Sequence, residues 1–220
     1  MRGEIVGAVF GFPDMHLHGR AFYEFLTLRK RFFVDTLSWT IPHDDVAEMD
    51  QYDNPAARYS VALQDGRVVG GARIMRFSDR WGAHGCMLKD AAEGKIPGIP
   101  VDVLPTGRAF HNTAECTRLV LSDSFTSNEE RREALSVVVR GLVQSAIDFG
   151  SSELVTLTVP AFCRSLSRLG YDVEQIGARY HSPLDGRTYA VLSMPATHAG
   201  LEMPRSEILI PAKVRSRPPA

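Results

Sequence analysis

Apolar residues at helical spacing predict four helices. The longest apolar stripe consists of Leu135, Val138, Val139, Leu142, Val143, Ala146 and Ile147. Ser127 stands at its N-cap position and Gly150 at its end, as capping requires. Residues 22–33 form a second, aromatic-rich amphipathic helix, with the basic run 29–31 between its apolar positions. Shorter helices are expected at residues 87–92 and 160–170.

Alternating or continuous apolar runs predict strands at residues 5–12, 59–63, 68–77, 113–121, 154–159, 172–180 and 187–194. Asp65-Gly66 is a hairpin signal between the second and third of these. Gly70-Gly71 inside the third predicts a bulge or a close backbone approach. In the strand 113–121, simple alternation places Glu115 and Arg118 on opposite faces of the sheet.

This order of elements predicts an α/β fold, a three-layer α/β/α sandwich with a mixed central sheet. Residues 1–195 form one domain, and the proline-rich segment 196–220 is expected to be a loosely ordered tail. Residues 36–55 show no period and read as an irregular loop, and loops of that length in a compact domain are usually functional or disordered.

The loop and the helix before it hold Arg29, Phe33, Trp39, Asp50 and Asp53. One interpretation is a pocket for a cationic, partly aromatic small molecule. The indole would offer a face for a cation–π contact, and the two carboxylates would pair with an ammonium group. The alternative interpretation makes the two aromatic residues part of the core and the carboxylates either solvated loop charges or helix caps.

Glu115 and Arg118 form a second candidate set, at the centre of the sheet. Burial there raises the pKa of a carboxyl group, which suits a general base, and the arginine would orient an anion. The alternative is a structural ion-pair network that includes Arg73.

Composition excludes several functional classes. A net charge of -1 argues against a nucleic-acid binder. The sequence has no run of eighteen consecutive apolar residues, so no transmembrane helix is predicted. The 3 cysteines show no CxxC spacing, so they fit reduced thiols in the cytoplasm. Histidine and cysteine spacings do not match a metal site, and no phosphate-binding glycine loop or nucleophile elbow is present.

Taken together, the candidate residues resemble the signature of the LuxI-type acyl-homoserine lactone synthases, the autoinducer synthase family. The spacing is R-x3-F-x5-W-x10-D-x2-D, followed by an arginine and by E-x2-R on a later strand, and the strings EMDQYD and AECTRLVL match local blocks of that family. Eight positions are filled: Arg29, Phe33, Trp39, Asp50, Asp53, Arg73, Glu115 and Arg118. The resemblance covers residues 22–195.

The resemblance implies a fold similar to the GNAT acyltransferases and a reaction in two parts. An acyl thioester, on acyl carrier protein or coenzyme A, acylates the α-amine of S-adenosylmethionine. The carboxylate of the adduct then attacks its own γ-carbon, expels methylthioadenosine and closes the lactone, a quorum-sensing signal. S-adenosylmethionine is a substrate in this scheme, and no cofactor or metal is expected.

The family pattern implies a role for each residue. Phe33 and Trp39 form an aromatic wall for the adenosyl and sulfonium groups, and the carboxylates of Asp50 and Asp53 hold the amino-acid part. Arg29 or Arg118 binds the substrate carboxylate or supports a network around it, with Arg73 as a supporting residue. Glu115 is the candidate base, directly or through a water, and Asp50 is the second candidate. An acyl pocket is expected at Phe110, Thr156 and Thr158.

Two other readings remain open at the level of sequence. One is a GNAT-type N-acyltransferase that acts on another amine, although residues 122–133 lack the glycine-rich loop that such enzymes use for coenzyme A. The other is a non-catalytic module that binds an acyl carrier or acyl-CoA.

Overall fold

The computed structural model describes residues 3–199 and 208–209. Its α-helices are α1 (Ala21–Arg29), α2 (Met87–Ala92), α3 (Asn128–Asp148) and α4 (Phe162–Arg168), with a 3-10 helix η1 (Met15–His18) and a π-helix η2 (Lys30–Thr36). Its strands are β1 (Ile5–Gly11), β2 (Arg58–Gln64), β3 (Arg67–Arg76), β4 (Thr113–Leu121), β5 (Glu153–Thr158), β6 (Glu174–Gln175), β7 (Tyr180–His181), β8 (Thr188–Pro195) and β9 (Ile208–Leu209).

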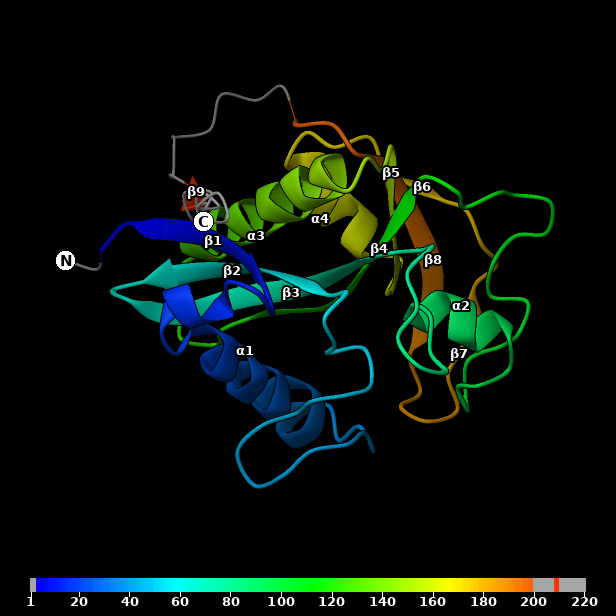
Figure 1. Ribbon diagram of the computed structural model, residues 1–220, viewed down its shortest axis with the longest axis horizontal. Helices are drawn as coiled ribbons and strands as arrows, with labels where there is room; N and C mark the ends of the chain where they lie inside the picture. Colours follow the sequence, from blue (N-terminus) through cyan, green and yellow to red (C-terminus); the bar gives the residue numbers. More distant parts are fainter. Residues whose placement is uncertain (1–2, 200–207, 210–220) are drawn as a thin grey trace, which may run out of the picture.

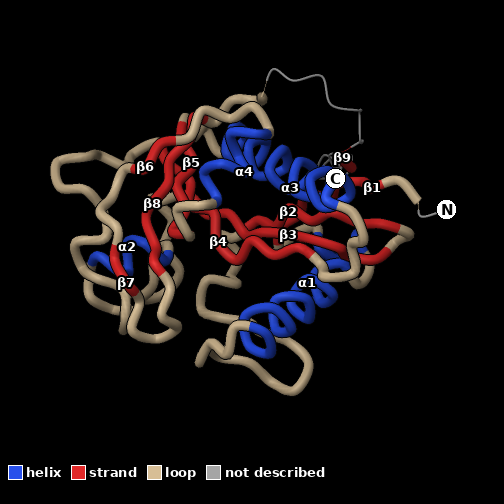
Figure 2. Tube along the Cα trace, turned by 180° about the vertical axis from the view of Figure 1, so that it is seen from behind, coloured by secondary structure: helices blue, strands red, loops and turns tan. Residues whose placement is uncertain are grey.

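The strands form one mixed sheet in the order β6-β8-β5-β4-β3-β2-β1-β9, with β7 beside β8. Among the strands within the described residues, only the β4–β5 and β1–β9 pairs are parallel. Helices α3 and α4 cover one face, and α1 and α2 cover the other (Figure 1), an arrangement also visible from behind (Figure 2). The predicted three-layer α/β/α sandwich with a mixed sheet is therefore confirmed.

Most predicted elements are present with nearly the expected bounds. The side chain of Ser127 accepts a hydrogen bond from the backbone N–H of Glu130 at 3.1 Å, as an N-cap should. Asp65 and Gly66 have φ of 52° and 73°, the left-handed pair that a two-residue hairpin turn requires. At Gly71 an added Cβ would lie 2.7 Å from the Phe25 ring, so the predicted close approach, here of α1 to β3, is confirmed.

Two elements differ from the prediction. The single strand expected at residues 172–180 is wrong, because only the two-residue strands β6 and β7 pair with β8. Between them the chain passes closely over another loop, and a Cβ at Gly177 would lie 2.7 Å from the carbonyl oxygen of Val103. The helix expected at residues 22–33 continues to Thr36 as the wider π-helix η2. The tail predicted at 196–220 lies mostly outside the described residues, although β9 within it pairs with β1.

A bulge in β4 changes which residues share a face. Arg118 has φ 57°, and the pairing of β3 with β4 shifts by one residue between Gly71 and Arg73. This extra residue turns the Arg118 side chain to the α1 side, the same side as Glu115. The prediction that Glu115 and Arg118 lie on opposite faces is therefore wrong.

The parallel strands β4 and β5 are paired only at their beginnings. Their register contains three pairs, and the last joins Glu115 with Val155. Beyond it β4 continues to Leu121 and β5 to Thr158 without further pairing between them. The carboxyl ends of the two central strands therefore diverge beside Glu115.

Candidate active site

The π-helix η2 and the loop after it build an aromatic wall from Phe33 and Trp39. Their rings stack with centroids 4.9 Å apart and an interplanar angle of 29°. The backbone N–H of Trp39 donates to the Phe33 carbonyl at 2.9 Å, and Ser38 between them has φ 56°. π-Helical turns such as η2 are frequent at functional sites. The guanidinium of Arg118 lies 5.5 Å from the centre of the Phe33 ring, which adds a cation–π contact.

Beside this wall lies an arginine–carboxylate cluster, which we define as Arg29, Arg73, Arg118, Glu48, Asp50 and Asp53. Arg29 binds both oxygens of Asp53, at 2.7 and 2.9 Å, and donates from Nε to Glu48 at 2.6 Å. Arg73 binds Asp50 at 2.5 and 3.2 Å and reaches Asp53 at 3.0 Å. Arg118 donates to Asp50 at 2.8 Å and to Glu48 at 3.3 Å. Three positive and three negative groups thus balance one another below the surface.

Hydrogen bonds within one turn hold the side chains of Asp50 and Asp53 in place. The backbone N–H of Asp50 donates to Asp53 Oδ2 at 2.9 Å, and that of Tyr52 donates to Asp50 Oδ1 at 2.9 Å. Each carboxylate therefore accepts a hydrogen bond from a backbone N–H group of the same turn. Its remaining lone pairs accept hydrogen bonds from arginines. The loop 37–57 is irregular, as predicted, and these side-chain contacts fix the turn at residues 50–53 within it.

Electrostatics separate the carboxylates of the site into two kinds. Burial alone raises the pKa of Asp50, but the charges of Arg73 and then Arg118 outweigh it and hold the pKa well below its ordinary value. The pKa of Asp53 is likewise lowered, because Arg73 and Arg29 outweigh the effect of burial. Both carboxylates are ionised at neutral pH, and neither is a strong proton acceptor.

Glu115 is different. It lies at the β4–β5 divergence with 2% of its surface exposed, and its oxygens accept hydrogen bonds from the backbone N–H groups of Met87 and Leu88 at 2.7 and 2.8 Å. Burial raises its pKa to about 7, even though the N–H groups at the start of α2 and the charge of Arg73 act in the opposite direction. A carboxyl group with that pKa exchanges protons near neutral pH.

The structure thus brings eight predicted residues to one side of the sheet, but in two layers. The side chains of Arg29 and Arg73 are 0% and 1% exposed, so they shape the cluster from within and present no surface to a ligand. Arg118, at 10%, and the half-buried Trp39 lie closer to solvent. The alternative interpretation, a structural ion network, therefore describes Arg29 and Arg73, and the pocket interpretation describes the outer residues.

The three residues predicted for the acyl pocket lie on different faces. Phe110 stacks on Phe77 at 4.9 Å on the α2 side and lines a hollow of about 380 Å³ together with Lys89. Thr156 and Thr158 alternate with Val155 and Leu157 along β5, and the latter two pack on the α1 and α2 side. The threonines therefore point to the α3 side, on the other face of the sheet from Phe110.

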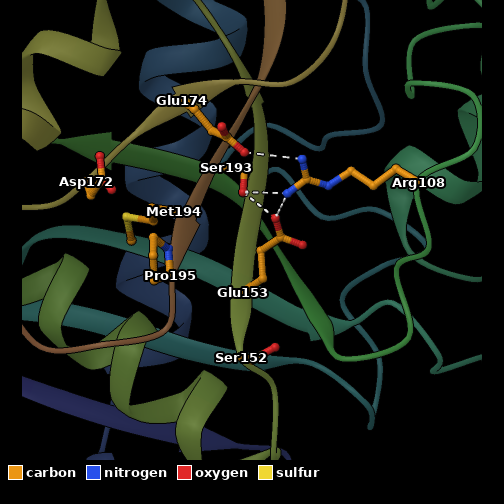
Figure 3. A pocket seen from close by; sticks show the side chains of 8 residues that line it. All are labelled: Arg108, Ser152, Glu153, Asp172, Glu174, Ser193, Met194 and Pro195. Carbon is orange, nitrogen blue, oxygen red and sulfur yellow. Dashed lines mark hydrogen bonds and ion pairs between the residues drawn. The ribbon is translucent and has the colours of Figure 1, made fainter.

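A second hollow, of about 320 Å³, opens at the beginning of β5 (Figure 3). Among its charged groups, Arg108 is paired with both Glu153 and Glu174. No residue of the arginine–carboxylate cluster lines it. These ion pairs attach the loop between α2 and β4 to the sheet, and we assign the hollow no part in the chemistry.

Sequence reasoning missed several contacts of the site. Glu48 bridges Arg29 and Arg118, and its signal was available as the first letter of the quoted string EMDQYD. Tyr59 donates its hydroxyl hydrogen to Asp53 at 3.1 Å, and nothing in the strand pattern singles it out. Asp185 accepts a hydrogen bond from the Trp39 indole across 146 residues of sequence, a contact that local spacing does not encode.

The described part of the chain offers no metal site and no membrane-spanning helix. Within residues 3–199 and 208–209, the structure holds no group of three or more histidine, cysteine or acidic residues arranged to bind a metal ion. Over the same residues, none of the helices has both the length and the apolar character that crossing a membrane requires.

The chain resembles characterised proteins in sequence. A family model described as "Autoinducer synthase" matches residues 15–202. An acyl-homoserine-lactone synthase of Aliivibrio fischeri is 30% identical over 172 residues, which cover 77% of this chain and 83% of the relative. One from Rhizobium radiobacter is 28% identical over 172 residues, covering 75% of each chain.

Solved structures share the fold. The CoA-dependent acyl-homoserine lactone synthase BjaI, with SAM and isopentyl-CoA, superposes with a TM-score of 0.69 at 15% identity, covering 88% of this chain and 84% of that one. The synthase MesI gives 0.65 at 21% identity, with 87% and 89% covered. An acyl-CoA N-acyltransferase from Pseudomonas aeruginosa gives 0.53 at 14% identity, with 86% and 99% covered, so the fold is GNAT-like as expected. On the family match, the chain belongs to the autoinducer synthase family of acyl-homoserine-lactone synthases.

Proposed function

We propose that this enzyme acylates the α-amine of S-adenosylmethionine with an acyl thioester and then closes the product to an N-acyl-homoserine lactone. One observation carries the proposal most directly. The aromatic wall, the arginine–carboxylate cluster and Glu115 share one side of the sheet, at the point where β4 and β5 stop pairing. At this junction, an amine bound by the cluster and a thioester held between the two strands could meet.

S-adenosylmethionine fits the outer layer of the site. Its adenine and sulfonium groups would lie against Trp39 and Phe33, because aromatic faces attract cations and stack on flat rings. Its carboxylate would meet Arg118, and its ammonium group would approach Asp50, which stays ionised at neutral pH. Arg29 and Arg73 would not touch the substrate, but they would fix Asp50 and Asp53 in place.

The thioester would enter between β4 and β5. Backbone groups that no longer pair across the two strands can bond to the amides of a pantetheine arm, as an added strand does. An acyl chain passing through this gap would run between Phe110 on one face and Thr156 and Thr158 on the other. Both acyl carrier protein and coenzyme A present this arm, and the chain is proposed to accept its acyl group from one of them.

Glu115 is the proposed proton acceptor. Its two oxygens already hold the start of α2, so it would take the ammonium proton through a water molecule. Its pKa of about 7 places the ionised form within the range where a base is effective. Asp50, bound by two arginines, would bind substrate and leave proton transfer to Glu115.

The chemistry then proceeds in two steps. The neutral amine adds to the thioester carbonyl, and collapse of the tetrahedral adduct breaks the C–S bond and releases the thiol. The carboxylate oxygen next attacks the γ-carbon, the bond to the sulfonium sulfur breaks, and methylthioadenosine leaves as a neutral thioether. S-adenosylmethionine is consumed as a substrate, so the scheme uses no cofactor. We place the reaction in the cytoplasm, consistent with Cys86, Cys116 and Cys163 as free thiols.

The test is release of methylthioadenosine by the purified protein, followed by chromatography. S-adenosylmethionine would be incubated with acyl-CoAs and with acyl carrier proteins bearing the same chains. We expect release that depends on one class of thioester. No release with any thioester on either carrier would contradict the proposal. Acylation of another amine without methylthioadenosine would support the alternative N-acyltransferase.

A further inference from the structure

The turn between β7 and β8 reaches the aromatic wall and contacts Trp39. Asp185 in this turn accepts a hydrogen bond from the indole Nε1 of Trp39 at 2.9 Å, and the bonded atoms are partly buried. An indole carries a single N–H donor, so this contact uses its whole hydrogen-bonding capacity. The two residues come from opposite ends of the domain, one after η2 and one before β8.

Asp185 is held in place by its own hairpin. The same oxygen accepts from the Tyr189 hydroxyl at 2.5 Å, and the other oxygen accepts from the backbone N–H of Arg187 at 3.1 Å. The backbone N–H of Ser182 donates to the Arg187 carbonyl at 2.8 Å and closes the turn. The carboxylate is therefore oriented by its own turn as well as by the indole.

The hairpin is itself anchored to the sheet. Tyr189 stacks on Tyr180 at 5.9 Å, and Tyr180 packs against the core on the α1 and α2 side. Its strand β8 pairs with β5 as far as Thr158, so the hairpin is continuous with a strand that lines the proposed thioester gap. Asp185 thus connects the fixed sheet with a loop that has little regular structure of its own.

Trp39 needs such support. It follows Ser38, whose φ of 56° is costly for a residue with a side chain, and it begins the irregular loop 37–57. The indole stacks on Phe33 and packs at the edge of the core, and its N–H group donates to Asp185. Without the carboxylate, the indole could turn away from Phe33 and leave the wall incomplete.

We propose that Asp185 is a positioning residue for S-adenosylmethionine binding, acting through its hydrogen bond to the Trp39 indole. The inference rests on the proposed function, in which Trp39 contacts that substrate. It adds a second segment, the β7–β8 turn, to a binding wall otherwise built from residues 29–53. A small change in Trp39 orientation would weaken substrate binding, while thioester binding in the β4–β5 gap would be little affected.

The first test compares Asp185→Ala with the wild type by calorimetric titration of S-adenosylmethionine and by steady-state kinetics. Loss of a hydrogen bond to a charged group predicts that the dissociation constant and KM for S-adenosylmethionine rise about tenfold. The KM for the thioester should stay within about twofold of wild type, a change of about 0.4 kcal/mol. Asp185→Asn, which keeps a carbonyl acceptor, should recover most of the affinity. Arg187→Ala, in the same turn, should behave as wild type.

A double-mutant cycle tests the route through Trp39. Trp39→Phe keeps an aromatic ring but lacks the indole N–H, so Asp185→Ala should cost little further affinity in that background. Equal, additive losses in both backgrounds would overturn the proposal, as would unchanged affinity in Asp185→Ala. Circular dichroism on every variant identifies a loss of folding.

A spectroscopic readout separates this proposal from the proposed function. In a Trp81→Phe background Trp39 is the remaining tryptophan, and Asp185→Ala should shift its emission to the red as the indole leaves its site. An unshifted emission would overturn the positioning role, whether or not substrate binds. A wild-type protein that does not bind S-adenosylmethionine would instead count against the proposed function.

Discussion

Asp50 and Glu115 are carboxylates buried on the same side of the sheet, yet their surroundings shift their pKa values in opposite directions. Asp50 meets two arginines, which keep it ionised and weakly basic. Glu115 is bonded to two uncharged N–H groups in a buried position, and its pKa rises to about 7. Because a useful base must bind and release protons near the working pH, Glu115 fits proton transfer and Asp50 fits binding.

The first prediction concerns the pH dependence of turnover. The base form of Glu115 accumulates as pH rises through about 7, so kcat should increase over that interval and then level off. In Glu115→Gln this acidic limb should disappear and kcat should fall about a hundredfold, while the dissociation constant of S-adenosylmethionine changes little. A large loss of affinity with unchanged acylation would make Glu115 a binding residue.

The second prediction separates support from binding within the cluster. Asp53 bonds to Arg29, Arg73 and Tyr59, so Asp53→Asn leaves buried guanidinium groups incompletely paired. The free energy of unfolding, measured with urea, should fall by about 3–5 kcal/mol. Asp45→Asn, an exposed carboxylate in the same loop, should change it by less than about 0.5 kcal/mol. Equal stability of both variants would contradict the supporting role of Asp53.

At the scale of single elements, the bulge in β4 and the π-helix η2 decide which side chains meet. Arg118 joins Asp50 and Phe33 only because one extra residue in β4 breaks the alternation of faces. Likewise, η2 continues α1 as a wider helix that contains Phe33, whose ring stacks on Trp39. Hydrophobic periodicity assumes regular geometry, so it predicted both elements and missed the irregularity within each.

The third prediction tests this backbone conformation. Arg118 has φ 57°, which glycine adopts freely and alanine does not. Arg118→Gly and Arg118→Ala both lose the guanidinium and should both lose activity with S-adenosylmethionine. Denaturant unfolding should nevertheless show Arg118→Gly more stable than Arg118→Ala by about 1 kcal/mol. If alanine were as stable as glycine at this position, the left-handed bulge would be incorrect.

At the scale of the whole molecule, the sequence allowed the layers to be predicted better than the contacts between distant segments. The stripe on α3 and the Asp65-Gly66 hairpin are local signals, and both were correct. The Trp39–Asp185 contact and the divergence of β4 from β5 depend on how segments meet in space. The spacing of residues within one segment carries no information about contacts between distant segments.

The candidate residues themselves came from a spaced motif, so their gathering on one side of the sheet was expected. Their division into an inner, supporting layer and an outer layer was not. That division follows from burial, since Arg29 and Arg73 are covered while Arg118 retains some exposure. Burial is a property of the packed molecule, and a motif carries no information about it.

The central claim is that one active site both acylates S-adenosylmethionine and closes the lactone. The most direct measurement is mass spectrometry of the product made by the purified protein from an acyl thioester and S-adenosylmethionine with heavy carbon in the four carbons from its carboxylate to its γ-carbon, but not in its methyl group. We predict an N-acyl-homoserine lactone that carries the heavy carbon, formed in equal amount to unlabelled methylthioadenosine. An N-acyl product that keeps the adenosyl group, or an acylated amine without heavy carbon, would contradict the account.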